Sequence, residues 1–140
     1  MPNRLMPTLA ALALCASIPL LAGCGTKGLA GTTAKATAEG FAAALAKQDF
    51  ALAATAFDYT TSARQQNENW DDIPKGQRDL IIGKLQEERA AALSVYASRL
   101  GGNARVGSEQ GDTVVLQGDA GSLSLKMMQS GGKYYIAQVW

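Results

Sequence analysis

Two consecutive glycines, Gly101 and Gly102, divide this chain into two parts with different hydrophobic patterns. Before them, apolar residues recur at spacings of three and four, as they do on one face of an α-helix. After them, short alternating segments are separated by the turn sequences QGD, GDAG and SGG, which are typical of β-hairpins. Helices followed by an antiparallel meander predict an α+β domain with the helices packed on one side of the sheet.

The part after the glycines predicts four strands, at residues 104–109, 113–117, 122–129 and 133–140. In the third, SLSLKMMQ, apolar residues alternate with serine and lysine, as expected for a sheet with one buried face. In the fourth, alternation predicts one face with Tyr134 and Ile136, and another with Tyr135, Ala137 and Val139.

The part before the glycines predicts three helices. The first lies in AKATAEGFAAALAKQ, where one face carries Ala34, Ala38, Phe41 and Leu45. Asp49 is expected to cap a short second helix in DFALAATAF, because its carboxylate can accept a free backbone N–H. The next segment, DYTTSARQQNENW, loses periodicity, so we expect a loop there, with or without a short strand at residues 59–62.

The third helix is expected to be long and continuous from Pro74 to Gly101, since proline suits a first helical turn and glycine suits an end. Lys84 and Glu88 are spaced to form an i,i+4 ion pair. Its predicted apolar stripe is Ile81, Leu85, Ala92, Tyr96 and Leu100. We expect the core between helices and sheet to contain Phe41, Leu45, Phe57, Leu85, Tyr96, Leu125 and Ile136.

The N-terminal segment has the layout of a signal peptide: Arg4 is its only charge, and an apolar core of 13 residues follows at 9–21. A membrane-spanning helix needs about 20 apolar residues, so this segment is too short to be one. The sequence LAGC, ending at Cys24, resembles the lipobox of bacterial lipoproteins. By contrast, Cys15 follows a bulky leucine.

The lipobox resemblance implies removal of residues 1–23, a diacylglyceryl group on the Cys24 sulfur and an acyl chain on its amino group. Gly25, in place of the aspartate that favours retention in the inner membrane, implies the periplasmic face of the outer membrane. We expect residues 24–32 to form a flexible tether, whose last eight residues would reach roughly 15 Å, and residues 33–140 to form the domain.

Removal of Arg4 would leave 12 basic residues against 12 acidic ones, because the chain has 13 and 12. Binding to nucleic acid is therefore not expected, since it requires a basic excess. Cys24 would carry lipid, so the domain would contain no disulfide. The chain has no histidine, no cluster of metal ligands, no glycine-rich phosphate loop and no G-x-S-x-G motif, so no metal or cofactor is expected.

Three stretches carry a second resemblance: FAAALAKQDFALA, Trp70 before a helix, and the terminal GGKYYIAQVW. Together they resemble the small lipoproteins of the NTF2-like superfamily, which implies a cone-shaped α+β domain; a cystatin-like arrangement is the alternative. NTF2-like domains include enzymes and non-catalytic modules, so the resemblance does not decide the activity.

The strongest catalytic candidate is Tyr59 with a carboxylate from Asp58, Asp71 or Asp72, since NTF2-like isomerases and dehydratases can pair a tyrosine with an acid. An apolar pocket would raise the pKa of such an acid into a useful range. However, Asp71 and Asp72 lie just before the long helix, where capping explains them better.

A binding role is the other hypothesis, for an apolar or amphiphilic small molecule or an envelope protein. Its candidate contact residues are Trp70, Met128, Tyr135 and Trp140, although aromatic side chains in such a fold more often fill the core. If both faces of the meander are partly apolar, the outer one needs a cover, and a homodimer through the sheet would supply it. We therefore expect a membrane-anchored protein with a non-catalytic binding or accessory role.

Overall fold

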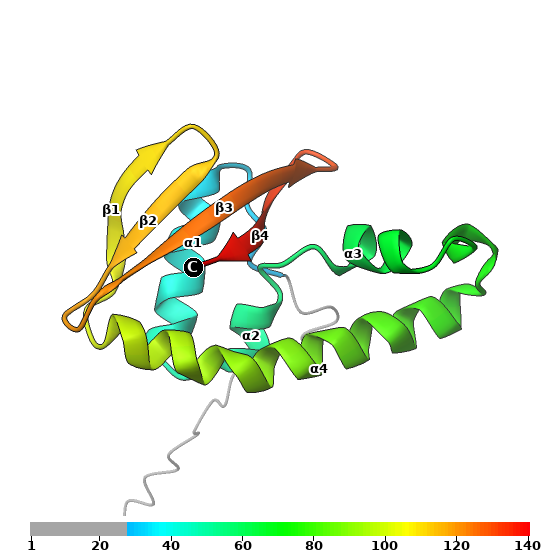
Figure 1. Ribbon diagram of the computed structural model, residues 1–140, viewed down its shortest axis with the longest axis horizontal. Coiled ribbons are helices and arrows are strands. Elements are labelled where there is room, and N and C mark those ends of the chain that lie inside the picture. Colours follow the sequence, from blue (N-terminus) through cyan, green and yellow to red (C-terminus); the bar gives the residue numbers. More distant parts are fainter. Residues whose placement is uncertain (1–27) are drawn as a thin grey trace, which may run out of the picture.

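The structure, a computed structural model, describes residues 28–140. The predicted signal peptide and Cys24 lie outside the described residues. The described chain has an α+β architecture in which helices precede a four-stranded antiparallel sheet, as predicted (Figure 1). Its helices are α1 (Ala34–Ala46), α2 (Phe50–Ala54), α3 (Tyr59–Gln66), a 3-10 turn η1 (Trp70–Asp72) and α4 (Lys75–Leu100).

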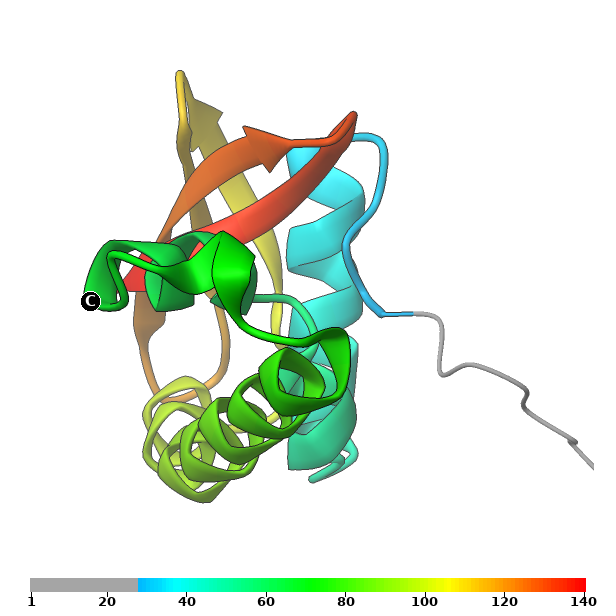
Figure 2. The same cartoon turned by 90° about the vertical axis from the view of Figure 1, so that its right-hand side faces the viewer.

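The sheet is a meander with strand order β1-β2-β3-β4. Its strands are β1 (Arg105–Gln110), β2 (Thr113–Gln117), β3 (Ser122–Ser130) and β4 (Lys133–Val139), each close to its predicted bounds. Viewed from the side, α1 lies along one face of the sheet and α4 runs below it (Figure 2).

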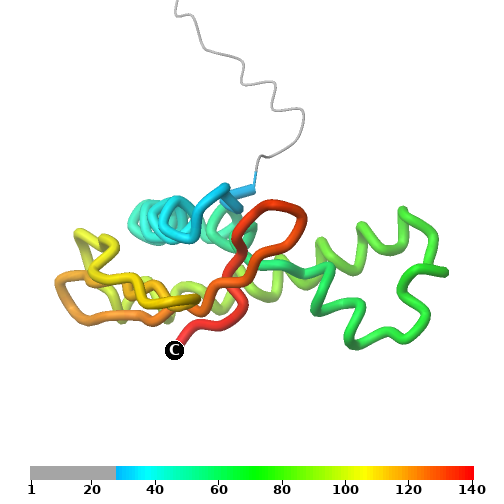
Figure 3. Tube along the Cα trace, turned by 90° about the horizontal axis from the view of Figure 1, so that it is seen from above, coloured from blue at the N-terminus to red at the C-terminus, as the bar shows by residue number. Residues whose placement is uncertain are grey.

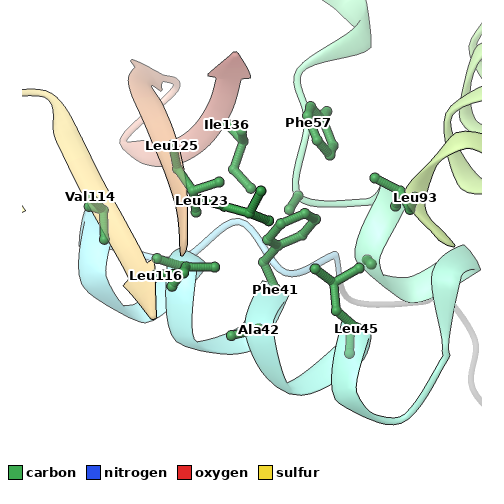
Figure 4. Close-up of a cluster of buried hydrophobic side chains, with 14 of the residues drawn as sticks. Phe41, Ala42, Leu45, Phe57, Leu93, Val114, Leu116, Leu123, Leu125 and Ile136 are labelled. Atoms are coloured by element: carbon green, nitrogen blue, oxygen red, sulfur yellow. The ribbon is translucent and has the colours of Figure 1, made fainter. Parts of the chain in front are cut away.

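The core lies between α1, the inner face of the sheet and the C-terminal part of α4 (Figure 4). Five of the seven predicted core residues are buried, namely Phe41, Leu45, Phe57, Leu125 and Ile136. Leu93, Leu116 and Leu123 join them, all with 1% exposure or less. The helical and strand periodicities therefore identified the correct faces of α1, β3 and the middle of β4.

Helix α4 is long and continuous, as predicted, but its buried face is rotated from the predicted stripe. Of that stripe only Leu100 is buried, together with Leu93 from outside it. Ala92 is exposed, and the other three residues, Ile81, Leu85 and Tyr96, are only half-buried. The N-terminal part of α4 extends beyond the sheet, and α3 lies beside it in both views (Figures 1 and 3). Leu85 lies in this extension, which explains why it lacks the complete cover expected of a core residue. The predicted Lys84–Glu88 ion pair does not form within residues 28–140.

Residues 59–66 form helix α3, so the expectation of a loop or short strand there was wrong. Asp58 caps this helix: its carboxylate accepts the Thr61 N–H at 3.1 Å and the Thr61 hydroxyl at 2.6 Å. Only Tyr59 and Ala63 of α3 are buried. A helix with so small an apolar face produces no clear periodicity in the sequence.

Asp71 and Asp72 do not cap α4, contrary to prediction. They lie in η1, and the N-cap position of α4 is Pro74, which makes no side-chain cap hydrogen bond. Asp71 instead pairs with Arg64 of α3 at 2.9 Å. The extended Ile73 separates the two aspartates from the helix start, so their carboxylates are not at its cap.

A β-bulge changes the predicted facing of β4. Lys126 pairs with Gln138, but Met127 pairs with Ile136, so Ala137 is the extra residue. Val139 therefore lies opposite Leu125 and packs against the core, on the face opposite to the predicted one.

Gly101 ends α4 with φ +71°, a left-handed conformation that glycine adopts without strain. A Cβ at this position would lie 2.8 Å from the Cβ of Ala120, so the close approach of the β2–β3 turn also requires glycine. The residue that divides the two sequence patterns thus lies where the end of α4 packs closely against the β2–β3 turn.

We predict that Leu93→Ala lowers the free energy of unfolding by about 2 to 5 kcal/mol, because it removes a fully buried side chain from α4. Leu80→Ala is the matched control on the same helix: Leu80 is 75% exposed, so the change should stay within about 0.5 kcal/mol. Urea titration measures both. Equal losses would show that α4 is not oriented as described.

Candidate functional site

Three hollows meet where α3 and α4 leave the body of the domain, and Tyr59 lines all of them. Their volumes are about 290, 300 and 200 Å³. Arg89 lines both the second and the third, and we call these two hollows together the crevice. The crevice is lined by Phe57, Asp58, Tyr59, Thr61, Ser62, Gln65, Gln66, Leu85, Glu88, Arg89, Ala92, Met128, Ile136 and Ala137.

Arg89 is the principal cation of the crevice. Its guanidinium lies 4.6 Å from the centre of the Phe57 ring, within the range of a cation–π contact. Within residues 28–140 it forms no ion pair, and the nearby Asp58 carboxylate is occupied by Thr61. No sequence pattern singled out Arg89. Its position seven residues after Ile82 and four before Leu93 places it on the face of α4 that turns toward the body.

Tyr59 is a buried packing residue whose hydroxyl donates a 2.6 Å hydrogen bond to the backbone carbonyl of Ala54. Its ring lies 6.5 Å from that of Phe57, centre to centre. Burial raises the pKa of Tyr59 to about 12, although the charge of Arg89 acts in the opposite direction. A hydroxyl with this pKa and a fixed internal acceptor is a poor proton donor at neutral pH.

The structure brings only one of the three candidate carboxylates to Tyr59. Asp58 lines two hollows together with Tyr59, but its oxygens accept the two hydrogen bonds that cap α3. Asp71 and Asp72 are exposed in η1 and line none of the hollows that contain Tyr59. Of the predicted catalytic residues, only Tyr59 and Asp58 lie together, and both form hydrogen bonds that stabilise the fold.

Three of the four candidate binding residues, Met128, Tyr135 and Trp140, lie on the outer face of the meander, and Trp70 lies elsewhere. Trp70 is 2% exposed and lines a small hollow with Ile82 and Arg78, whereas Trp140 is 52% exposed at the C-terminus. Met128 and Tyr135 are half-buried cross-strand neighbours, but Met128 lines the crevice and Tyr135 lines the first hollow. Met128 is therefore the candidate that the structure places in the crevice.

The outer face of the meander carries Met128, Tyr135 and Trp140, which exchanges two backbone hydrogen bonds with Ser124, and is mainly polar elsewhere. Its central positions are Thr113, Val115, Gln117, Ser122, Ser124 and Lys126, of which only Val115 is aliphatic. The half-buried Met128 and Tyr135 and the 52% exposed Trp140 give this face some apolar area, and the homodimer through the sheet that the sequence suggested stays a prediction. The crevice is one concave, partly apolar surface of this domain; a larger hollow of about 570 Å³ lies between the ends of α1 and α4 and is lined by Leu45, Phe50 and Ala97 among others.

Within residues 28–140, no group of histidine, cysteine or acidic residues is arranged to hold a metal ion. No helix in the same range has the length and apolar character that a transmembrane span needs. The sequence matches no protein-family model, no curated protein and no solved structure.

We predict a specific effect of pH on Tyr59. Because its pKa is raised from 10.0 to about 12 in the folded state, its contribution to stability is complete below pH 10 and is lost as pH rises through about 12. Tyr59→Phe also removes a buried hydrogen bond, at a cost of about 1 to 2 kcal/mol at neutral pH. Urea titrations between pH 7 and pH 12 measure both effects.

The parent protein should lose more stability than Tyr59→Phe as pH rises from 10 to about 12. Its other tyrosines are present in both proteins, so the difference between the two curves isolates Tyr59. Parallel curves over this pH range would contradict the buried, hydrogen-bonded state of its hydroxyl.

Proposed function

We propose that this chain is a lipid-anchored protein of the bacterial cell envelope whose α+β domain has a non-catalytic binding or accessory role. In this proposal Cys24 carries the diacylglyceryl and acyl groups, the protein is located at the periplasmic face of the outer membrane, and the domain is NTF2-like. The order of helices before an antiparallel meander is consistent with that family.

One observation supports the proposed role. The groups that could catalyse proton transfer are engaged in hydrogen bonds that stabilise the fold, while the crevice beside them is accessible to a ligand. The Tyr59 hydroxyl is bonded to Ala54, and the Asp58 carboxylate is bonded to Thr61. The neighbouring Arg89 guanidinium and the Met128 side chain line the crevice, and Arg89 forms no ion pair within residues 28–140. A cation next to an apolar wall suits a small amphiphilic molecule or an apolar segment of an envelope protein.

The anchor can be tested by substitution. We predict that Cys24→Ala abolishes labelling of the protein by radioactive palmitate and releases it from membranes, because the thiol is the acceptor of the lipid. Cys15→Ala is the matched control and should leave both unchanged. Continued labelling of the Cys24→Ala protein would overturn the proposed anchor.

The binding role can be tested by complementation of a deletion strain. We predict that Met128→Glu impairs the cellular role, because a carboxylate on the crevice wall would pair with Arg89 and remove apolar surface. Ser122→Glu places the same charge on the same face of β3, away from the crevice, and should complement. Membrane levels are compared by immunoblot.

Tyr59→Phe separates binding from catalysis, because it removes the proton that an enzyme would use. The binding role predicts that this variant complements. If Tyr59→Phe fails at normal abundance while Met128→Glu complements, the binding role is wrong and an NTF2-like enzyme that uses Tyr59 replaces it.

A further inference from the structure

Hydrogen bonds attach the chain to the domain from Leu29 onward, whereas the sequence predicted that the domain begins at residue 33. The Leu29 N–H donates to the Thr55 hydroxyl at 3.0 Å, and the Gly31 N–H donates to the Thr37 hydroxyl at 2.9 Å. The Gly31 carbonyl accepts the Tyr134 N–H of β4 at 2.8 Å. Residues 29–31, predicted as part of a flexible tether, therefore belong to the folded body.

This attachment limits the reach of an anchor at Cys24. Five residue steps separate Cys24 from Leu29, so even a fully extended chain spans at most about 18 Å. Helix α4 alone, with 26 residues, is about 39 Å long. A lipid on Cys24 would thus hold the side of the domain that carries Leu29 close to the bilayer.

That side contains the first of the three hollows, which is lined by Gly28 and Ala30 together with Lys133 and Tyr135. We call these four residues the anchor face. Lys133 is exposed at the start of β4 and forms no ion pair within residues 28–140. Asp58 lines the same hollow, but its carboxylate is bonded to Thr61. Lysine and tyrosine are residue types that favour the membrane interface, where lysine attracts anionic headgroups.

We propose that the anchor face lies on the membrane surface, with Lys133 against the phosphate groups of anionic lipids, so that the first hollow opens toward the bilayer. The inference rests on the lipid anchor in the proposed function. It adds an orientation, which the anchor alone would not give if residues 24–32 were all flexible.

Two serines at opposite ends of β3 provide a matched pair of probe positions. Ser130 is next to the β3–β4 turn and pairs with Lys133, whereas Ser122 is eight residue steps away, or about 26 Å along the strand. If Cys24 is acylated and residues 1–23 are removed, the protein has no other thiol. Ser130→Cys and Ser122→Cys can then each be labelled with a nitroxide in the acylated protein.

The labelled proteins are reconstituted in vesicles of phosphatidylethanolamine and phosphatidylglycerol that contain a nickel-chelating lipid, and nitroxide relaxation is measured by EPR. We expect several-fold greater relaxation enhancement by nickel at position 130 than at position 122. Insertion of about twelve Gly/Ser residues between Lys27 and Gly28 should abolish the difference without loss of binding, because the longer tether no longer orients the domain.

Lys133→Gln in the Ser130→Cys protein should reduce the enhancement in these vesicles, but not in vesicles of phosphatidylcholine. Equal enhancement at the two positions in vesicle-bound protein would overturn the orientation, and no effect of Lys133→Gln would overturn the headgroup contact. Absence of the acylated preparation from vesicles would instead overturn the anchor itself, so the two failures are distinguishable.

Discussion

The contacts of Phe57 join the three parts of this domain. Its ring packs edge-on against Phe41 of α1, with centroids 5.8 Å apart, and receives the Arg89 guanidinium of α4 on its face. Its backbone segment continues the sheet, since the Ile136 N–H of β4 donates to the Ala56 carbonyl at 2.8 Å. One residue between α2 and α3 thereby fixes the relative positions of α1, α4 and the last strand.

The crevice is a consequence of this arrangement. The body of the domain covers only the C-terminal part of α4, so the remainder extends outward and α3 packs beside it (Figure 1). Tyr59, which bonds α3 to the end of α2, and Asp58, which caps α3, form part of the crevice wall. Structural stability and surface shape therefore depend on the same residues, and a polar group in this wall is not by itself a sign of catalysis.

The attachment of residues 29–31 connects the fold to the proposed location. Thr37, which is fully buried in α1, accepts the Gly31 N–H and donates to the Tyr134 carbonyl at 2.9 Å. One hydroxyl thus ties the incoming chain to both a helix and a strand. If Cys24 is acylated, this small polar contact determines which side of the domain meets the membrane.

The sequence by itself determined the α+β class, the bounds of the strands and of α4, the cap at Asp49 and the buried faces of α1 and β3. These features depend on local periodicity, on turn chemistry at glycine and on short-range hydrogen bonds, all of which can be read from neighbouring residues. Only the tertiary structure decided the helical state of residues 59–66, the rotation of α4, the inward facing of Val139 and the role of Arg89. Each depends on contacts between segments far apart in the chain: Tyr59 needs the end of α2, Val139 needs a bulge against β3, and Arg89 needs the ring of Phe57. Such contacts leave no periodic pattern, so the crevice could not be predicted from the sequence.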